Sequence, residues 1–124
     1  MAKIMIVDDA LFMRKMLAKI LTEEGHEICS EATNAKEAVE KYKISKPDLV
    51  TMDIVMPMME ELDGIGAVKE MIKLDPNAKI LLVSAMSQQP IVVEAIRLGA
   101  KDFLSKPVNP QRLKETVKNI LAGK

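Results

Sequence analysis

Residues 49–57 read Leu-Val-Thr-Met-Asp-Ile-Val-Met-Pro, and this stretch decides the fold. Its first four residues form a short apolar run that is typical of a strand buried on both faces of a sheet. The run ends at Asp53, and an ionised carboxylate is costly to remove from water unless a cation or several hydrogen-bond donors meet it. We therefore expect Asp53 at the carboxyl edge of a sheet, half in solvent, with such partners beside it.

Apolar runs like this one recur along the chain and alternate with helical patterns of apolar residues. Strands are predicted at 3–7, 27–32, 49–52, 79–84 and 101–105, and a helix follows each, starting near residues 11, 35, 65, 90 and 110. The alternation predicts a doubly wound α/β domain, in which five parallel strands carry five helices on both faces through right-handed crossovers.

Polar residues gather where the predicted strands end: Asp8 and Asp9, Asp53, Ser84 and Lys106. Each alone has an ordinary explanation, such as a helix cap, a turn or a solvated lysine. Together they are more specific, because ligands of such folds bind at the carboxyl ends of the strands. Converging carboxylates need a cation, and their oxygen atoms suit Mg²⁺. A hydroxyl and a lysine suit a phosphoryl group, so the set predicts a carboxylate that accepts a phosphoryl group with the help of Mg²⁺.

The composition argues against several other classes of protein. The 124 residues suit one domain, 1–124, and 18 basic side chains balance 18 acidic ones, which argues against nucleic-acid binding. No apolar run approaches the roughly 20 residues that span a bilayer, and we expect no membrane insertion. The single cysteine, Cys29, allows no internal disulfide, and the start of the chain lacks a secretory signal, so we expect a cytoplasmic protein.

Five short motifs together resemble the response-regulator receiver domain, and the resemblance extends over the whole chain. They are Val7-Asp8-Asp9, Met52-Asp53-Ile54 with Met56-Pro57, Asp63-Gly64, Ser84-Ala85, and Lys101-Asp102-Phe103-Leu104 with Lys106-Pro107. Within that family the chain is most similar to the stand-alone regulators of chemotaxis. The resemblance implies a flavodoxin-like sheet of order 2-1-3-4-5. It also implies a single receiver domain, monomeric and without an output domain.

The resemblance assigns a role to each residue of the acidic cluster. Asp53 would be the phosphoacceptor and, with Asp9 and the main-chain carbonyl of Val55, would bind Mg²⁺ directly. Asp8 would act on the ion through water.

The resemblance also assigns the residues that would respond to the phosphoryl group. Ser84 would hydrogen-bond its oxygens and move toward them on activation, and Lys106 would pair with its charge. The Lys106-Pro107 peptide is expected to be cis. Phe103 would occupy the aromatic switch position, where the lack of a hydroxyl leaves only a change of packing.

One segment departs from the family pattern. The family runs Met-Pro-x-Met-Asp-Gly after the acceptor strand, whereas residues 57–64 read Pro-Met-Met-Glu-Glu-Leu-Asp-Gly and are longer by three. The extra length is either a tolerated surface insertion, since loop length costs little, or a partner-recognition segment carrying Glu60 and Glu61. We favour partner recognition, for instance of an archaeal-type chemotaxis adaptor.

The expected function is a phospho-accepting switch of a two-component chemotaxis pathway. A histidine kinase would be the phosphodonor, and a flagellar or archaellar motor switch or adaptor protein would be the output partner, with a separate phosphatase as a further partner. The alternative is a magnesium-dependent phosphatase with an aspartyl nucleophile. Such enzymes carry an acid two residues after the nucleophile for proton transfer, and here that residue is Val55. Hydrolysis of the phosphoryl group needs a water held in line with the phosphorus. The side chains best placed to hold it lie two positions after Asp53 and two after Ser84; here they are Val55 and Met86, and neither hydrogen-bonds water well. We therefore expect no enzymatic turnover beyond self-phosphorylation and slow autodephosphorylation.

The predicted output surface centres on the fourth helix, which carries more apolar residues than one core-facing stripe needs. We expect Val92, Ala95 and Ile96 to face the sheet. Part of the Ile91–Leu98 flank, or Val93, would then lie near solvent. The residues predicted to bind the partner are Ile91, Val93, Phe103, Glu60 and Glu61.

Overall fold

The computed structural model describes residues 2–54, 64–85 and 89–123. Its strands are β1 (Lys3–Val7), β2 (Glu27–Ala32), β3 (Leu49–Met52), β4 (Ile80–Ser84) and β5 (Asp102–Ser105). Its helices are α1 (Leu11–Glu23), α2 (Ala35–Ser45), α3 (Gly64–Leu74), α4 (Gln89–Leu98) and α5 (Pro110–Leu121). The predicted alternation of strands and helices is therefore confirmed, and most element bounds differ from the expected ones by one residue at most.

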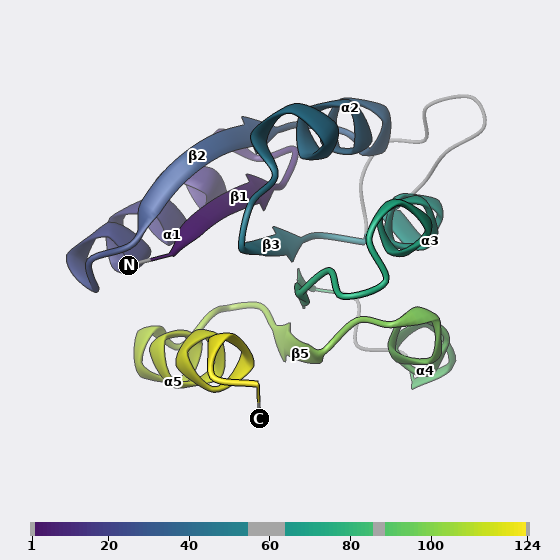
Figure 1. The fold of residues 1–124 in the computed structure, drawn as a ribbon. Helices are drawn as coiled ribbons and strands as arrows, with labels where there is room; N and C mark the ends of the chain where they lie inside the picture. The colour runs from purple at the N-terminus through teal and green to yellow at the C-terminus, as the bar shows by residue number, and fades with distance from the viewer. Residues whose placement is uncertain (1, 55–63, 86–88, 124) are drawn as a thin grey trace.

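The five strands form one parallel sheet in the order β2-β1-β3-β4-β5 (Figure 1), as the resemblance implied. The order reverses between β1 and β3, because the chain leaves β1 toward β2 on one side and later returns to β3 on the other. In open α/β sheets, the crevice at such a reversal is where ligands bind. The fold thus places the residues that follow Val7 and Met52 at the expected ligand position.

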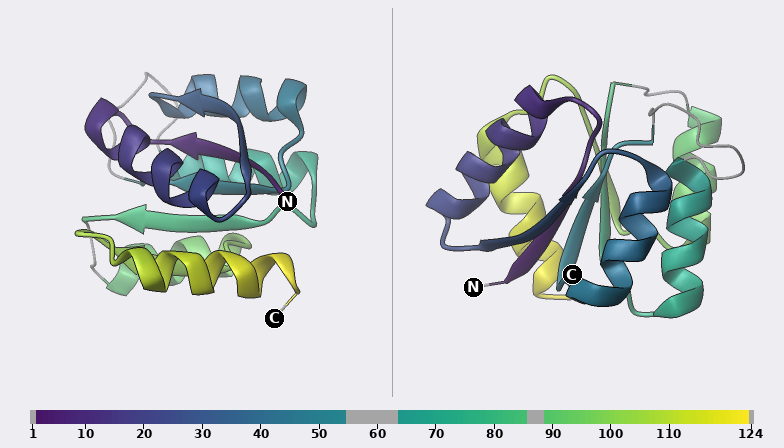
Figure 2. Two further views of the ribbon diagram at one scale, coloured as in Figure 1. Left: turned by 90° about the vertical axis from the view of Figure 1, so that its left-hand side faces the viewer. Right: turned by 90° about the horizontal axis from the view of Figure 1, so that it is seen from above.

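Helices α1 and α5 cover one face of the sheet, and α2, α3 and α4 cover the other (Figure 2). Successive strand residues point to opposite faces, so Ile4 and Ile6 pack with α1 and α5, whereas Met5 and Val7 pack with the other three helices. All four are buried. Both faces of the inner strands are therefore core, which explains why these strands read as continuous apolar runs.

Local hydrogen bonds define where helix α2 begins. The Asn34 side chain accepts a hydrogen bond from the Glu37 N–H at 2.8 Å, as an N-cap does. The Glu37 carboxylate accepts from the Thr33 N–H at 2.7 Å, one residue earlier than in a standard capping box. Within the described chain, no helix combines the length and the apolar character needed to span a membrane.

Gly64, the first residue of α3, sets how closely this helix approaches the acidic site. A Cβ built on Gly64 would lie 2.5 Å from the Cα of Ile54, which is much closer than two carbon atoms can approach. Only glycine lets the helix start against the backbone that follows Asp53. The motif glycine is therefore required by packing beside the strand exit.

Candidate functional site

Asp8 and Asp53 lie side by side because the strands before them are neighbours. Val7 pairs with Met52 in the register of β1 and β3, and the Asp53 N–H continues the ladder by donating to the Val7 carbonyl at 3.0 Å. On the other side, the Asp8 N–H donates to the Ala32 carbonyl at 3.0 Å. Main-chain pairing thus fixes both aspartates at the same edge of the sheet.

Three carboxylates meet at this edge, since one oxygen atom each from Asp8, Asp9 and Asp53 lies within 4.8 Å of the others. Asp9 is exposed, whereas Asp8 is only 1% exposed and Asp53 only 4%. The expectation that Asp53 stands half in solvent is therefore wrong. Its burial is possible because a protein cation takes the place of water.

That cation is the ammonium group of Lys106, which follows β5. Its Nζ lies 2.7 Å from Oδ2 of Asp8 and 2.9 Å from Oδ2 of Asp53, and the side chain is 17% exposed. Burial alone would lower the pKa of Lys106, but the hydrogen bonds and charges of the two aspartates outweigh it and raise the pKa. Lys106 therefore stays charged and holds the two carboxylates together.

Ser84 and the Lys106-Pro107 peptide complete the sheet edge. Ser84 is buried as the last residue of β4, and its carbonyl accepts a hydrogen bond from the Lys106 N–H at 3.0 Å. The Lys106-Pro107 peptide is cis, as expected. A main-chain hydrogen bond of Lys106, the residue that also carries the ammonium, therefore joins the ends of β4 and β5.

The donor set of this cluster fits Mg²⁺. Carboxylate oxygens are hard ligands, and the ion typically uses one or two of them together with water and phosphate oxygens. Asp9 is the most accessible of the three acids and makes no side-chain hydrogen bond or ion pair with any other residue in the described ranges. The Lys106 ammonium lies between the Asp8 and Asp53 carboxylates, which shows that this edge of the sheet requires positive charge. Val55, the expected carbonyl ligand, and Met86 lie outside the described residues.

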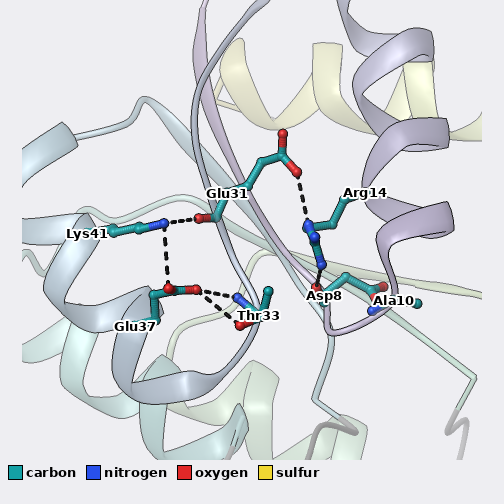
Figure 3. Close-up of polar contacts among 7 residues, drawn as sticks. All are labelled: Asp8, Ala10, Arg14, Glu31, Thr33, Glu37 and Lys41. Carbon is teal, nitrogen blue, oxygen red and sulfur yellow. Dashed lines mark hydrogen bonds and ion pairs between the residues drawn. The ribbon is translucent and has the colours of Figure 1, made fainter.

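The structure adds one residue that the sequence analysis missed. Arg14 lies one turn into α1, and its Nη1 donates to the main-chain carbonyl of Asp8 at 2.8 Å (Figure 3). Its Nε donates to Oε1 of Glu31 at 2.9 Å. The position of an arginine in the first turn after an acidic strand exit was the available sequence signal.

The predicted partner-binding residues occupy mixed environments. Val93 is 45% exposed, whereas Ile91 and Phe103 are half-buried and pack against the core that α2, α3 and α4 share with the sheet. Ile96 is exposed, so the expectation that it faces the sheet is wrong, while Ala95 does lie fully buried. Ala95 belongs to the core cluster that the helices on this face share with the sheet. Glu60 and Glu61 lie outside the described residues.

Comparisons with known proteins agree with this geometry. Residues 4–118 match the family model of the response regulator receiver domain. The chain is 57% identical to the chemotaxis protein CheY of Thermotoga maritima over 118 residues, 95% of this chain and 96% of that protein. It is 51% identical to the chemotaxis protein CheY of Bacillus subtilis over 119 residues, 96% of this chain and 97% of that protein.

Among solved structures, the chain is similar to one in a CheX–CheY–BeF3–Mg²⁺ complex from Borrelia burgdorferi. The TM-score is 0.89 at 35% sequence identity, over 95% of this chain and 87% of that chain. The match confirms the receiver fold.

Proposed function

The chain belongs to the response-regulator receiver domain family, and on that premise we propose that it is a chemotaxis switch phosphorylated on Asp53 by a histidine kinase. Receiver domains of this kind act as signalling switches and not as classical enzymes. The observation that carries the proposal is the Lys106 ammonium, which bonds both Asp8 and Asp53 at the reversal of the strand order.

The chemistry proposed for this site is transfer of one phosphoryl group. A carboxylate oxygen of Asp53 attacks the phosphorus of a phosphohistidine; the new P–O bond forms as the P–N bond breaks, and the electron pair returns to the imidazole nitrogen. Asp8, Asp9 and Asp53 would hold Mg²⁺, which when bound neutralises charge on the phosphoryl oxygens. The Lys106 ammonium lies within hydrogen-bond distance of Asp53 and would bond the negatively charged phosphoryl oxygens once they are present.

Transfer would change the charge balance around Lys106. The acyl phosphate formed on Asp53 carries more negative charge than the free carboxylate, and its phosphoryl group offers three acceptor oxygens. Lys106 would then exchange part of its contact with Asp8 and Asp53 for the phosphoryl oxygens. Ser84 would supply a hydroxyl to the same group, and the half-buried Phe103 would repack as β4 and β5 adjust.

The proposed partners follow from the relatives. A motor switch or adaptor protein would read the phosphorylated surface around Val93 and Phe103, and Glu60 and Glu61 would contribute to its choice. A separate phosphatase is proposed because a similar CheY forms a complex with CheX. We also propose that residues 1–124 act as one monomeric receiver domain in the cytoplasm.

The direct test uses a small phosphodonor such as acetyl phosphate with Mg²⁺, followed by intact mass spectrometry. The native protein should gain one phosphoryl group, and Asp53→Asn should gain none. Asp102→Asn is the matched control, because it removes an exposed aspartate from another strand without touching the cluster. Labelling of Asp53→Asn to the same extent as the native protein would refute the assignment.

Turnover distinguishes the switch from the alternative, a magnesium-dependent phosphatase. A phosphatase would release many equivalents of phosphate from excess donor at a rate far above spontaneous hydrolysis. The proposed switch would stop near one phosphoryl group per chain and decay slowly. A pull-down with and without beryllofluoride would then identify the partner.

A further inference from the structure

Asp9 depends on the main chain for its position. Its carboxylate is exposed and makes no hydrogen bond or ion pair with the rest of the described chain, yet it lies within 4.8 Å of the Asp8 and Asp53 oxygens. Because no other side chain of the described residues holds the Asp9 carboxylate, its direction is set by the backbone that carries it. The peptide that joins Asp8 to Asp9 therefore decides whether Asp9 faces the site.

The polar groups of Asp8 are held by different parts of the fold. Its N–H donates to β2 at Ala32, its Oδ1 accepts from the Ala10 N–H at 2.9 Å, and its Oδ2 accepts from Lys106. Its carbonyl, which belongs to the peptide of Asp9, accepts from Arg14 at 2.8 Å. Arg14 is thus the side chain that fixes the plane of this peptide.

Arg14 is itself held in place. Its side chain is only 13% exposed, and its Nε is paired with Glu31 near the end of β2. The main chain at Glu31 is held by α2, because Lys41 donates to the Glu31 carbonyl at 2.6 Å. Figure 3 shows the guanidinium between the Glu31 carboxylate and the Asp8 carbonyl, with Lys41 and Glu37 on the far side of Glu31.

We propose that Arg14, held by Glu31, is a positioning residue that orients the Asp8–Asp9 peptide so that Asp9 can bind the divalent cation. Glu31 also pairs with the Arg14 guanidinium on the side of β2. The positive charge of Arg14 therefore stays beside the Asp8 carbonyl and does not pair with the Asp9 carboxylate. This inference rests on the proposed function, since it concerns the same metal site. It assigns a role to two residues outside the acidic cluster.

Electrostatics alone predicts the opposite effect, which makes the proposal sharply testable. Removing a positive charge near a metal site should tighten the binding of a cation, because less repulsion remains. Loss of a residue that orients a ligand should weaken it, typically by about 10- to 100-fold. The sign of the change in affinity therefore separates positioning from charge.

The experiment is calorimetric titration of Mg²⁺ into purified protein without phosphodonor, well below the melting temperature. Arg14→Gln should raise the dissociation constant about tenfold or more. Arg14→Lys keeps the charge and one hydrogen bond, so it should lose less. Glu31→Gln keeps an acceptor on an exposed side chain and should give a smaller loss in the same direction.

Lys15→Gln is the matched control, because it removes the same charge from the next residue of α1, where the side chain is exposed and unpaired within the described chain. It should leave the affinity unchanged within about twofold. Melting without Mg²⁺ separates a general loss of stability from a loss of affinity.

Unchanged or tighter Mg²⁺ binding by Arg14→Gln would overturn the inference. If the native protein accepted a phosphoryl group and bound Mg²⁺ while this variant bound it equally well, only the inference would fall. If the native protein bound no Mg²⁺, the proposed metal site and the inference would fall together.

Discussion

Replacement of Lys106 by methionine should destabilise the metal-free protein strongly. The substitution keeps most of the side-chain volume but removes the ammonium that lies 2.7 Å from Asp8 and 2.9 Å from Asp53. Both carboxylates are almost fully buried, so they cannot turn to water for compensation. Removing one partner of a buried ion pair costs about 3–5 kcal/mol. At roughly 4 °C per kcal/mol for a domain of this size, the melting temperature should fall by about 12–20 °C.

Mg²⁺ should stabilise the Lys106→Met variant more than it stabilises the native protein. In the native protein the ion must share the aspartate oxygens with an ammonium group, whereas in the variant it is the one cation among three carboxylates. A ligand that binds only the folded state at ten times its dissociation constant adds about 1.4 kcal/mol, and tighter binding adds more at the same concentration. The melting temperatures of the two proteins should therefore converge as Mg²⁺ is added.

The assay is a thermal melt of both proteins over a Mg²⁺ titration, at constant ionic strength so that general screening does not contribute. Lys73→Met is the control, because Lys73 forms an exposed pair with Glu70 at 3.8 Å and should change stability by less than about 0.5 kcal/mol. Two results would refute the reasoning. One is a metal-free melting temperature of Lys106→Met within about 2 °C of the native value. The other is an equal Mg²⁺ response in both proteins.

Three further predictions concern other parts of the fold. Burial, and to a lesser extent a nearby carboxylate, raises the pKa of Tyr42 from 10.0 to about 12. Because Tyr42 deprotonates first in the unfolded chain, the free energy of unfolding should fall by roughly 2 kcal/mol between these pH values. Urea unfolding should show a smaller loss of stability at alkaline pH for Tyr42→Phe than for the native protein, and an equal loss would contradict this. Gly64→Ala should lower the free energy of unfolding by about 3 kcal/mol and weaken Mg²⁺ binding, because its Cβ would lie 2.5 Å from the Cα of Ile54. Thermal melts and Mg²⁺ titration measure both effects, and a variant as stable as the native protein would contradict the prediction. Val93→Asp should reduce partner capture in the beryllofluoride pull-down without changing the melting temperature. Ile44→Asp, on the exposed side of α2, is the control; equal capture by both variants would show that Val93 is not part of the docking surface.

Much of the fold could be predicted because its inner strands are buried on both faces. Residues 49–52 and 80–84 read as largely apolar runs, and Pro47 and Pro76 separate them from the preceding helices. The strand order came from the resemblance and not from periodicity, because a pattern of apolar residues does not say which strands are neighbours. The structure confirms that order.

The residues that gather at the site were predictable, but their contacts were not. Strand ends place Asp8, Asp9 and Asp53 at one edge, and this follows from the parallel sheet alone. The burial of Asp53 depends on Lys106, which lies 53 residues further along the chain. Arg14 was missed for a related reason. One of its partners is a main-chain carbonyl, which no residue type marks in the sequence, and the other is Glu31, which lies 17 residues further along the chain. The exposure of Ile96 was missed because helical spacing does not decide which flank of α4 the sheet contacts.

Lys106 connects the acidic cluster to β5 at the edge of the sheet. Its side chain bonds the residues that follow β1 and β3, while its main-chain N–H donates to the carbonyl of Ser84 at the end of β4. One residue thus bonds groups at the ends of three strands and directly follows a fourth. We expect a change of charge at Asp53 to alter the position of the ammonium. The short link through Lys106 would then pass that displacement to Ser84 and to β5, where Phe103 lies two residues before the end of the strand. Coupling through this link requires that Lys106→Met, once stabilised by Mg²⁺, accept beryllofluoride without the chemical-shift changes that the native protein shows at the amides of β5. Equal changes at these amides in both proteins would show that the signal reaches β5 by another route.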